Sequence, residues 1–508
     1  MNSQSDEILP QESSLKRRAV LKIFLFFVLA CAFFLTIWAI TTYDSLNMTE
    51  IIFHLRLPAT GTSNELIFDG AFSTVVPAAL AATLFGILVW PPAEGSQSSA
   101  AALRKTKWKN YLSKGIVIIL VLVEVFLVQC NLDVYGYVKA QFTYSNFIAK
   151  IYVDPEDVLQ APKDKRNLVF IYLESIESTF MDKDSGGSFD QNRIPGLTQL
   201  AEENINFSHH EKIGGFRNSS GTSWTAGAIF GATTGLPLKM PIAAKGLSKI
   251  EEFFPGVTSL GDILEEEGYT NFLMMGSDST FAGKRMYFDQ HGDYLIKDLR
   301  WAEKAGLVTK DYEGKWGFED YKLYEFAKLE LTRLASIEKP FAFTMLTLDT
   351  HFENDDVCEC CPDTFDDNYS NNVACADKQA SDFVSWLQEQ DFYENTTVIV
   401  VGDHLTMNNE CCTDIPDEER AVYNCFLNAV EEPVNTNNRE FMATDLFPST
   451  LAALGYRIEG DRLGLGTNLF SDKETLAEEL GVEELDERFI DRSHYYEDRF
   501  IYNYERYR

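Results

Sequence analysis

Basic residues are scarce in this chain, most clearly after residue 150. The 508 residues include 44 Lys+Arg against 77 Asp+Glu, and the part beyond residue 150 holds 32 basic and 67 acidic residues, a net charge of −35. Because a phosphate backbone would be repelled by such a surface, nucleic acid is a poor match as a partner. The acidic excess favours solubility in salty or crowded surroundings and indicates no specific partner.

Internal repeats and low-complexity tracts are absent, which argues against a repeat architecture. Histidine is also rare, with seven residues in the whole chain. A histidine that directly follows a buried strand is therefore unusual here. The part beyond residue 150 is long enough for one large hydrophobic core.

Long uncharged apolar runs occur only near the N-terminus. Residues 23–40 and 71–90 carry no charge, and residues 116–132 carry only Glu124. A helix of about 20 apolar residues crosses the hydrocarbon core of a bilayer, so the pattern predicts three transmembrane helices. The alternative is buried helices of a soluble protein. No small-residue cleavage site of the Ala-x-Ala type follows the first run, which argues against a cleaved signal peptide.

Positive charge around these runs predicts their orientation. Four basic residues precede the first run and five lie between the second and third, whereas the loop between the first and second has only Arg56. The positive-inside rule therefore puts the N-terminus in the cytoplasm and everything after about residue 135 outside it. We expect a membrane domain over 1–135, a juxtamembrane linker over 136–165, a large domain over 166–475 and an acidic, aromatic tail over 476–508.

Cysteine usage supports an oxidising compartment. Seven of the nine cysteines lie in two acidic, loop-like clusters after residue 150: Cys358, Cys360, Cys361, Cys375, Cys411, Cys412 and Cys425. Disulfides are the first interpretation, and we expect at least one bridge between the 358–361 cluster and Cys375. The alternative is a zinc site, but Cys-x-Cys-Cys lacks the usual spacing of zinc ligands. Because seven is odd, at least one thiol stays unpaired unless it bonds another chain.

The large domain alternates between two kinds of segment. Short apolar runs at 167–173, 271–275, 340–348 and 396–402 are separated by stretches with helical spacing. Continuous apolar strands that alternate with helices predict an α/β fold with a mostly parallel sheet covered by helices on both faces. In such sheets the ligand site lies beyond the carboxyl ends of the strands.

Polar side chains follow each of these predicted strands. They are Glu174, Asp278 with the preceding Gly276-Ser277, Asp349-Thr350-His351, and Asp403-His404. A single carboxylate at a strand end is more often a helix cap than a ligand. Four polar strand ends, two of them with histidine, instead favour a metal or catalytic site, because hard oxygen and imidazole nitrogen ligands suit a divalent ion.

Thr222 is the candidate nucleophile. It follows Gly221 and would lie in the first turn of a predicted helix that runs through residues 226–230. The free N–H groups and the dipole of a helix N-terminus favour an anion such as phosphate. An unactivated hydroxyl is a weak nucleophile, so a metal would be needed to activate it. The alternative is that Thr222 only caps the helix.

The chain resembles the sulfatase-like phosphoglycerol transferases of the alkaline phosphatase superfamily. The resemblance runs from about 165 to 475 and is closest to the branch that modifies osmoregulated periplasmic glucans, with lipoteichoic acid synthase more distant. It rests on a series of strings in the family's order: YLESIE (172–177), NFSH (206–209), GTSWT (221–225), GLPL (235–238), FAGK (281–284), DTH (349–351) and GDHLTMNN (402–409).

The resemblance implies a site residue by residue. The family holds one divalent ion, usually Mn²⁺, with a glutamate, the nucleophilic threonine and an Asp-His pair, and these fall on Glu174, Thr222, Asp403 and His404; Mg²⁺ and Zn²⁺ are alternatives. Its substrate-binding residues fall on His351, Lys284 and, less securely aligned, Asp278. True sulfatases need a Cys/Ser-x-Pro-x-Arg setting, which this chain lacks, so sulfate-ester hydrolysis is not expected.

These residues predict a double displacement at phosphorus. Thr222 would attack phosphatidylglycerol, diacylglycerol would leave, and an extracytoplasmic glycan, such as a periplasmic glucan, would take the glycerophosphoryl group from the threonine. His351 would donate a proton or bind phosphoryl oxygens. The enzyme would be multi-pass in the inner (plasma) membrane, with its catalytic domain on the periplasmic side. The alternatives are a phosphoethanolamine transferase acting on a lipid or glycan, and a non-catalytic envelope glycan sensor.

Overall fold

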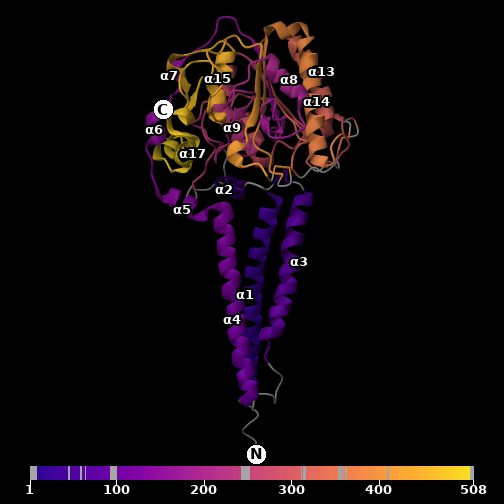
Figure 1. Cartoon of the computed structure of the whole chain (residues 1–508), viewed down its shortest axis with the longest axis vertical. Coiled ribbons are helices and arrows are strands. Elements are labelled where there is room, and N and C mark those ends of the chain that lie inside the picture. Colours follow the sequence, from indigo (N-terminus) through magenta and orange to yellow (C-terminus); the bar gives the residue numbers. More distant parts are fainter. Residues whose placement is uncertain are drawn as a thin grey trace, which may run out of the picture. The chain divides into compact units, whose positions relative to one another are not determined.

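The computed structural model describes residues 8–503 apart from 44–45, 58–59, 63, 92–99, 242–251, 311, 313–315, 353–356, 359, 361–362, 409–410 and 413. The chain divides into two compact units, which are shown in Figure 1. One consists of Met1–Leu46 and Ser63–Tyr135, and the other of Asn47–Thr62 and Gly136–Arg508. The short segment 47–62, which we expected to be part of the membrane domain, thus belongs to the second unit.

The first unit consists of long apolar helices, α1 (Ile8–Thr42), α3 (Asn64–Val89) and α4 (Ala100–Leu132). Among the described residues, Leu15–Thr42, Glu65–Val89 and Arg104–Leu132 are long and apolar enough to cross a membrane. Phe26 stacks on Phe85 with ring centroids 4.1 Å apart, which packs α1 against α3. Thr36 Oγ1 donates a hydrogen bond of 2.8 Å to Glu124 Oε1, so the carboxylate in the third apolar run has a polar partner.

The second unit contains a seven-stranded mixed sheet in the order β3-β8-β7-β2-β6-β4-β5. Its strands are β2 (Asn167–Leu173), β3 (Gly215–Phe216), β4 (Thr270–Met275), β5 (Leu295–Lys297), β6 (Phe341–Leu346), β7 (Thr396–Gly402) and β8 (Val422–Leu427). The five strands from β7 to β5 pair in parallel, and β8 runs antiparallel to β7. The predicted α/β architecture is confirmed.

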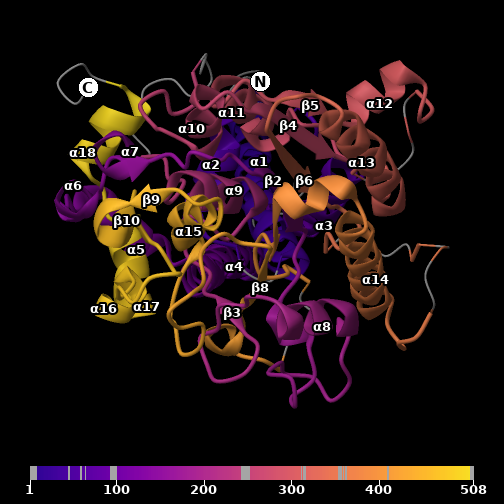
Figure 2. The same ribbon diagram turned by 90° about the horizontal axis from the view of Figure 1, so that it is seen from above.

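Helices cover both faces of this sheet, as Figure 2 shows. On one face lie α8 (Pro195–Glu203), α13 (Asp320–Ala335) and α14 (Asn368–Gln388). Their apolar side chains form one core cluster with Val169, Ile171 and Met345 of the strands. On the other face lie α9 (Thr225–Thr234), α10 (Leu260–Glu266) and α15 (Leu446–Ala453). Burial on both faces explains why the central strands read as continuous apolar runs.

Shorter elements complete the second unit. They are α2 (Met48–Arg56), α5 (Val134–Phe142), α6 (Phe147–Ile151), α7 (Pro155–Val158), η1 (Ser178–Phe180), η3 (Phe281–Gly283), α11 (Lys284–Gln290), α12 (Leu299–Ala305), η4 (Asp391–Asn395), η5 (Asp417–Glu419), η6 (Ala443–Asp445) and η7 (Glu459–Asp461), with the two-stranded pairs β1 (Leu159–Gln160) with β9 (Arg457–Ile458) and β10 (Arg462–Leu463) with β11 (Gly466–Thr467).

The described part of the C-terminal tail packs within the second unit. It forms α16 (Leu476–Leu480), α17 (Val482–Ile490), α18 (His494–Tyr496) and η8 (Glu497–Ile501). Lys239 Nζ donates hydrogen bonds of 2.6 Å to the carbonyls of Phe489 and Asp491, and the Tyr496 hydroxyl donates one of 2.6 Å to the Pro237 carbonyl. The tail therefore supports the segment that follows α9.

Candidate active site

Three ligand-type side chains meet where two neighbouring strands end. Glu174 follows β2, while Asp403 and His404 follow β7, and the two strands pair in parallel so that Leu173 lies opposite Gly402. One ligand atom from each of the three side chains lies within 4.8 Å of the other two. All three side chains are buried. The structure thus brings together three of the predicted metal ligands.

The ring of His404 is held in the form that binds metals. Its Nδ1 lies 2.8 Å from the Leu405 carbonyl, which only accepts hydrogen bonds, so Nδ1 carries the proton. In the neutral ring, Nε2 then presents a lone pair. It lies 3.5 Å from Glu174 Oε1 and 3.4 Å from Asp403 Oδ2. A backbone carbonyl that fixes the tautomer in this way is the usual outer support of a metal-binding histidine.

The electrostatics of these three groups fit a bound cation. Asp403 Oδ2 is buried and has no hydrogen-bond partner among the described residues. Burial and the neighbouring Asp403 carboxylate raise the pKa of Glu174 to about 7, although His404 opposes the shift. Burial lowers the pKa of His404, but the two carboxylates outweigh it and raise that pKa. Two buried carboxylates and one imidazole nitrogen around a common point form a donor set suited to a divalent ion.

The turn after β2 orients the carboxylates of Glu174 and Asp403 toward the candidate metal site. Ser175 has a positive φ of 54°, and its N–H donates a hydrogen bond of 2.8 Å to Asp403 Oδ1. The N–H of Glu174 donates to Thr347 Oγ1 at 2.9 Å. Gly402 is required by close packing, because a Cβ there would lie 1.9 Å from the Ile176 carbonyl oxygen. The backbone of both strand ends is therefore fixed by contacts across the sheet.

A buried ion pair holds the loop after His404. Arg420 Nε lies 3.1 Å from Glu177 Oε2, and both side chains are almost fully buried. Glu177 Oε1 also accepts a hydrogen bond of 2.8 Å from the N–H of Thr406, and Arg420 donates one of 3.0 Å to the Thr406 carbonyl. Because each charged group is fully paired, this ion pair can fix the loop without leaving an unpaired buried charge.

The structure places Thr225, rather than Thr222, beside the candidate metal ligands. Thr225 is the first residue of α9, and its Oγ1 lies 3.4 Å from both Glu174 Oε2 and His404 Nε2. Thr222 Oγ1 instead lies 2.8 Å from Ser219 Oγ. The helix begins three residues later than the sequence indicated, and Trp224 is its N-cap residue, so Thr222 neither starts nor caps it.

The methyl group of Thr222 is also turned away from this site. It lies against Gly231 in the next turn of α9, where an added Cβ would come within 2.7 Å of it. The signal for Thr225 was present in the sequence, because this residue ends the string GTSWT. Only the geometry of the turn before the helix shows which threonine hydroxyl faces Glu174 and His404.

Lys284 lies close to the candidate metal ligands, whereas Asp278 has a partner of its own. Burial lowers the pKa of Lys284 to about 8, and Glu174 and Asp403 oppose this shift. A buried ammonium suits a phosphate as a point charge. Asp278 Oδ2 accepts a hydrogen bond of 2.9 Å from Arg300 Nε, and Asp278 Oδ1 accepts one of 2.7 Å from Thr280 Oγ1.

His351 belongs to the same region but is neutral. Burial, His404 and Lys284 lower its pKa to about 3. Its ring centroid lies 4.8 Å from that of Trp316, and its Nδ1 is buried without a hydrogen-bond partner among the described residues. A neutral imidazole can donate one hydrogen bond to a phosphoryl oxygen. With this pKa it does not carry a spare proton at neutral pH.

The cysteines are only partly described. Cys375 is disulfide-bonded, and Cys361 lies outside the described residues. Cys358, Cys411, Cys412 and Cys425 of the second unit are free thiols. The sulfur atoms of Cys358, Cys360 and Cys375 lie within 4.8 Å of one another, but a disulfide sulfur is not a thiolate, which argues against the zinc site. The predicted bridge from the 358–361 cluster to Cys375 stays a prediction.

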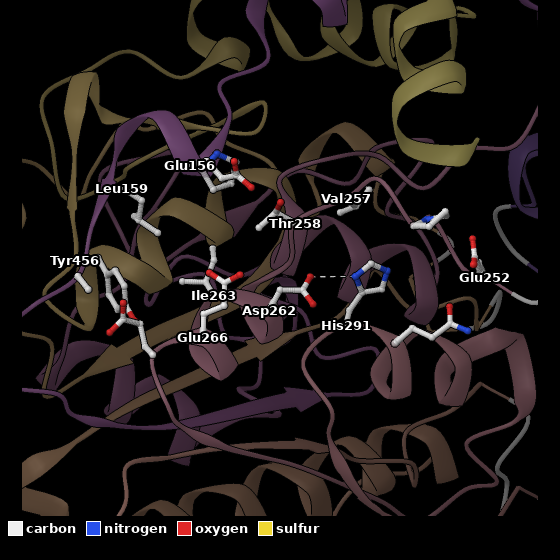
Figure 3. Close-up of a pocket in the computed structure, with 15 residues that line it drawn as sticks. Glu156, Leu159, Glu252, Val257, Thr258, Asp262, Ile263, Glu266, His291 and Tyr456 are labelled. Carbon is white, nitrogen blue, oxygen red and sulfur yellow. Dashed lines mark hydrogen bonds and ion pairs between the residues drawn. The ribbon is translucent and has the colours of Figure 1, made fainter. Parts of the chain in front are cut away.

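A cavity of about 550 Å³ lies elsewhere in the second unit (Figure 3). Its wall includes Glu156, Glu266 and Tyr456, and the Asp262–His291 pair, 3.0 Å apart, lies on one side. None of the strand-end residues lines this cavity. Both ring nitrogens of His291 have partners, Asp262 and the Phe253 carbonyl, so the cavity offers no comparable constellation.

Comparison with known proteins shows the family of the chain. A model of the family described as Sulfatase matches residues 166–456, more than half of the chain. Phosphoglycerol transferase I of Salmonella choleraesuis (strain SC-B67) is 28% identical over 345 residues, which cover 66% of this chain and 43% of that protein. Phosphoglycerol transferase I of Salmonella typhi is 29% identical over 280 residues, which cover 54% of this chain and 35% of that protein. The chain thus spans less than half the length of these curated relatives.

Among solved structures, a protein of the alkaline phosphatase superfamily from Vibrio parahaemolyticus superposes on this chain with a TM-score of 0.46 and 19% sequence identity. The match covers 63% of this chain and 74% of the Vibrio chain. The lipoteichoic acid synthase LtaP from Listeria monocytogenes superposes with a TM-score of 0.45 and 17% sequence identity. The match covers 64% of this chain and 80% of the Listeria chain.

Proposed function

We propose that this chain, which belongs to the sulfatase family, is a membrane-anchored transferase for the glycerophosphoryl head group of phosphatidylglycerol. The acceptor would be an extracytoplasmic glycan, such as a periplasmic glucan. The observation that carries the proposal is the Thr225 hydroxyl, which faces Glu174 and His404 at the start of α9. The similarity to phosphoglycerol transferases supports the choice of head group. The three apolar helices support a site that works next to a membrane.

Glu174, Asp403 and His404 would hold one divalent ion in this scheme. We propose Mn²⁺, with Mg²⁺ and Zn²⁺ as alternatives, because the donor set accepts all three. The buried and unpartnered Asp403 Oδ2 supports such a site. A divalent ion bound there would lower the pKa of a neighbouring hydroxyl and offset negative charge on phosphoryl oxygens.

The nucleophile in this proposal is Thr225, in place of Thr222. In the first step the Thr225 oxygen bonds to phosphorus and the bond from phosphorus to the diacylglycerol oxygen breaks. Diacylglycerol leaves with the proton that Thr225 gives up. In the second step an acceptor hydroxyl bonds to phosphorus, and Thr225 regains a proton as it is released.

The remaining residues would bind and orient the phosphoryl group. The free N–H groups and the dipole at the start of α9 favour its negative charge. Lys284 supplies a full positive charge below the pKa of about 8 that burial gives it. His351, being neutral, would donate a single hydrogen bond rather than a proton.

The test is a labelling experiment with the full chain. The purified protein is reconstituted in vesicles with Mn²⁺ and phosphatidylglycerol that carries label in its head group, with and without glucans. We expect label on the protein when no acceptor is present and on the glucan when one is added. Vesicles with labelled phosphatidylethanolamine provide the matched control. Label transfer from that lipid alone would contradict the proposal, and no transfer from either lipid would favour a non-catalytic role.

A further inference from the structure

Helix α2 has an unusual place in the chain. It lies between the first two apolar helices in sequence, yet it packs within the second unit. Asn47, Glu50 and His54 are three and four residues apart, so they lie on one face of the helix. Glu50 and Phe53 are buried, with 7% and 0% of their surface exposed. A connecting loop with no further role has no reason to bury such a face.

This face contacts the start of α9. Asn47 uses both ends of its amide: Oδ1 caps α2 by accepting a hydrogen bond of 2.9 Å from the N–H of Glu50, and Nδ2 donates one of 2.7 Å to Ser223 Oγ. The ring of Phe53 lies 5.7 Å from that of Trp224, centroid to centroid. Ser223 and Trp224 directly precede Thr225, so α2 packs against the turn that presents the proposed nucleophile.

The same face contacts the segment that carries Lys284. His54 stacks on Phe281, with ring centroids 5.7 Å apart and an interplanar angle of 24°. Burial and the charge of Lys284 lower the pKa of His54 to about 4. Phe281 in turn lies under the Lys284 ammonium, 4.8 Å from ring centroid to Nζ. Helix α2 therefore borders the site on both the nucleophile side and the cation side.

Glu50 is the one acidic side chain on this face, and one of its oxygens is unused. Oε1 lies 4.0 Å from His54 Nε2, while Oε2 is buried and has no hydrogen-bond partner among the described residues. The charges of Glu50 and His404 influence each other, which places both side chains in one poorly solvated region. A buried oxygen without a partner is rare in native structures and indicates a missing donor.

We propose that α2 is part of the active site and that Glu50 is a specificity-determining residue that binds the hydroxyl groups of the donor lipid's head group. This inference rests on the proposed function. Helix α2 would then supply the part of the site that distinguishes one head group from another, while the strand ends supply the chemistry.

A hydroxyl group suits this position better than an ammonium group. Burial raises the pKa of Glu50 to about 8, although His404 opposes the shift, which favours the neutral carboxyl group. A neutral carboxyl group can both donate a hydrogen bond to a hydroxyl and accept one from it. The Lys284 charge, which acts on His54 of the same helix face, would also repel a second cation. Glycerol therefore fits better than ethanolamine.

The test compares lipids that differ only in the head-group hydroxyls. The full chain, reconstituted in vesicles with Mn²⁺, is assayed for head-group release from phosphatidylglycerol and from phosphatidylpropanol, which has the same carbon chain without the hydroxyls. Wild type, Glu50→Ala, Glu50→Gln and Leu55→Ala are compared. Leu55 is the matched control, because it lies on the same helix and is 75% exposed. Mn²⁺ affinity and the thermal unfolding midpoint are measured for each variant.

We expect Glu50→Ala to lose about 5- to 100-fold in kcat/KM for phosphatidylglycerol, the range for an unpaired buried hydrogen-bonding group, mainly through KM. Its activity on phosphatidylpropanol and its Mn²⁺ affinity should stay near wild type. Glu50→Gln, which keeps a donor and an acceptor, should retain most of the preference for phosphatidylglycerol, and Leu55→Ala all of it.

Two failures can be told apart. If the wild type releases nothing from phosphatidylglycerol, the proposed function itself is wrong, and this inference falls with it. If the wild type is active but Glu50→Ala loses the same factor on both lipids, or keeps its full preference, Glu50 does not recognise the hydroxyls. If Glu50→Ala does not fold, the wild type and Glu50→Gln still provide the test. The inference is overturned if either protein releases the head groups of the two lipids equally well.

Discussion

Separate alanine substitutions of Thr222 and Thr225 distinguish the two threonines that compete for the role of nucleophile. Thr222→Ala removes a hydrogen bond of 2.8 Å to Ser219 Oγ and a methyl group that packs on Gly231. The cost is one of stability, about 1–3 kcal/mol for a lost buried hydrogen bond and its unpaired partner. Because the Thr225 hydroxyl stays in place, we expect the rate of head-group transfer to change by less than about tenfold, well below the loss of a nucleophile.

Thr225→Ala should have the opposite profile. The hydroxyl that faces Glu174 and His404 is lost. The two neighbouring hydroxyls of the same turn are already engaged, because Ser223 Oγ is bonded to Asn47 and Thr222 Oγ1 to Ser219. Removing a covalent nucleophile costs at least about 10³-fold in kcat. The thermal unfolding midpoint should stay close to wild type, because the side chain makes only long contacts of 3.4 Å.

The assay is mass spectrometry of protein incubated with phosphatidylglycerol and Mn²⁺ without an acceptor. A covalent glycerophosphoryl group adds about 154 Da to the modified residue. Both threonines lie in one tryptic peptide, residues 218–239, which follows Arg217 and ends at Lys239. Fragment ions that separate Thr222 from Thr225 are therefore needed. An adduct on Thr222, or an active Thr225→Ala variant, would refute the assignment.

Three further predictions concern the surroundings of the nucleophile. His404→Ala should lose Mn²⁺ binding and transfer activity together, whereas Thr225→Ala should keep most of its Mn²⁺ binding. Equilibrium dialysis measures Mn²⁺ binding by both variants. Full Mn²⁺ binding by His404→Ala would remove that ring from the ligand set. The transfer rate should fall as the pH rises through about 8, because burial lowers the pKa of Lys284 to about 8 and its charge is lost above that value. In Lys284→Arg the falling limb of the pH profile should move to higher pH, since a guanidinium stays charged; an unmoved limb would mean that another group titrates. Arg420→Met leaves Glu177 buried without its partner and should cost about 3–5 kcal/mol in a denaturant titration, and adding Glu177→Gln should restore part of that loss. A double variant no more stable than Arg420→Met would show that the ion pair is not the cause.

The meeting of the three candidate metal ligands was predictable because it depends on a simple rule of topology. Runs such as 396–402 could only be buried strands, and parallel strands end at the same edge of the sheet. Glu174, Asp403 and His404 had to meet once β2 and β7 became neighbours. The sheet order itself was not visible, nor was the antiparallel β8, because pairing partners far apart in sequence leave no local signal.

Our proposal moves the nucleophile from Thr222 to Thr225 for a local reason. Gly221 and the apolar run after Thr225 suggested a helix that starts near Thr222. In the structure the N–H and the hydroxyl of Thr222 both turn back to Ser219, and the helix starts only at Thr225. Element boundaries are the least reliable part of any sequence interpretation. An error of three residues at a helix start is enough to change which hydroxyl faces the metal ligands.

Helix α2 could not be recognised from the sequence at all. Counting charges and apolar residues divides the N-terminal part into spans and the loops between them, and the loop that contains Glu50 has no motif of its own. Its role becomes visible only through contacts with residues far away in the sequence, such as the hydrogen bond from Asn47 to Ser223, which lie 176 positions apart. A fragment that starts after residue 135 would therefore keep all three candidate metal ligands and Thr225 but lose Glu50, His54 and the cover that Phe53 gives to Trp224. Activity measured on such a fragment would report the chemistry of the strand ends without the selection that we assign to α2, which is why the experiments above use the full chain.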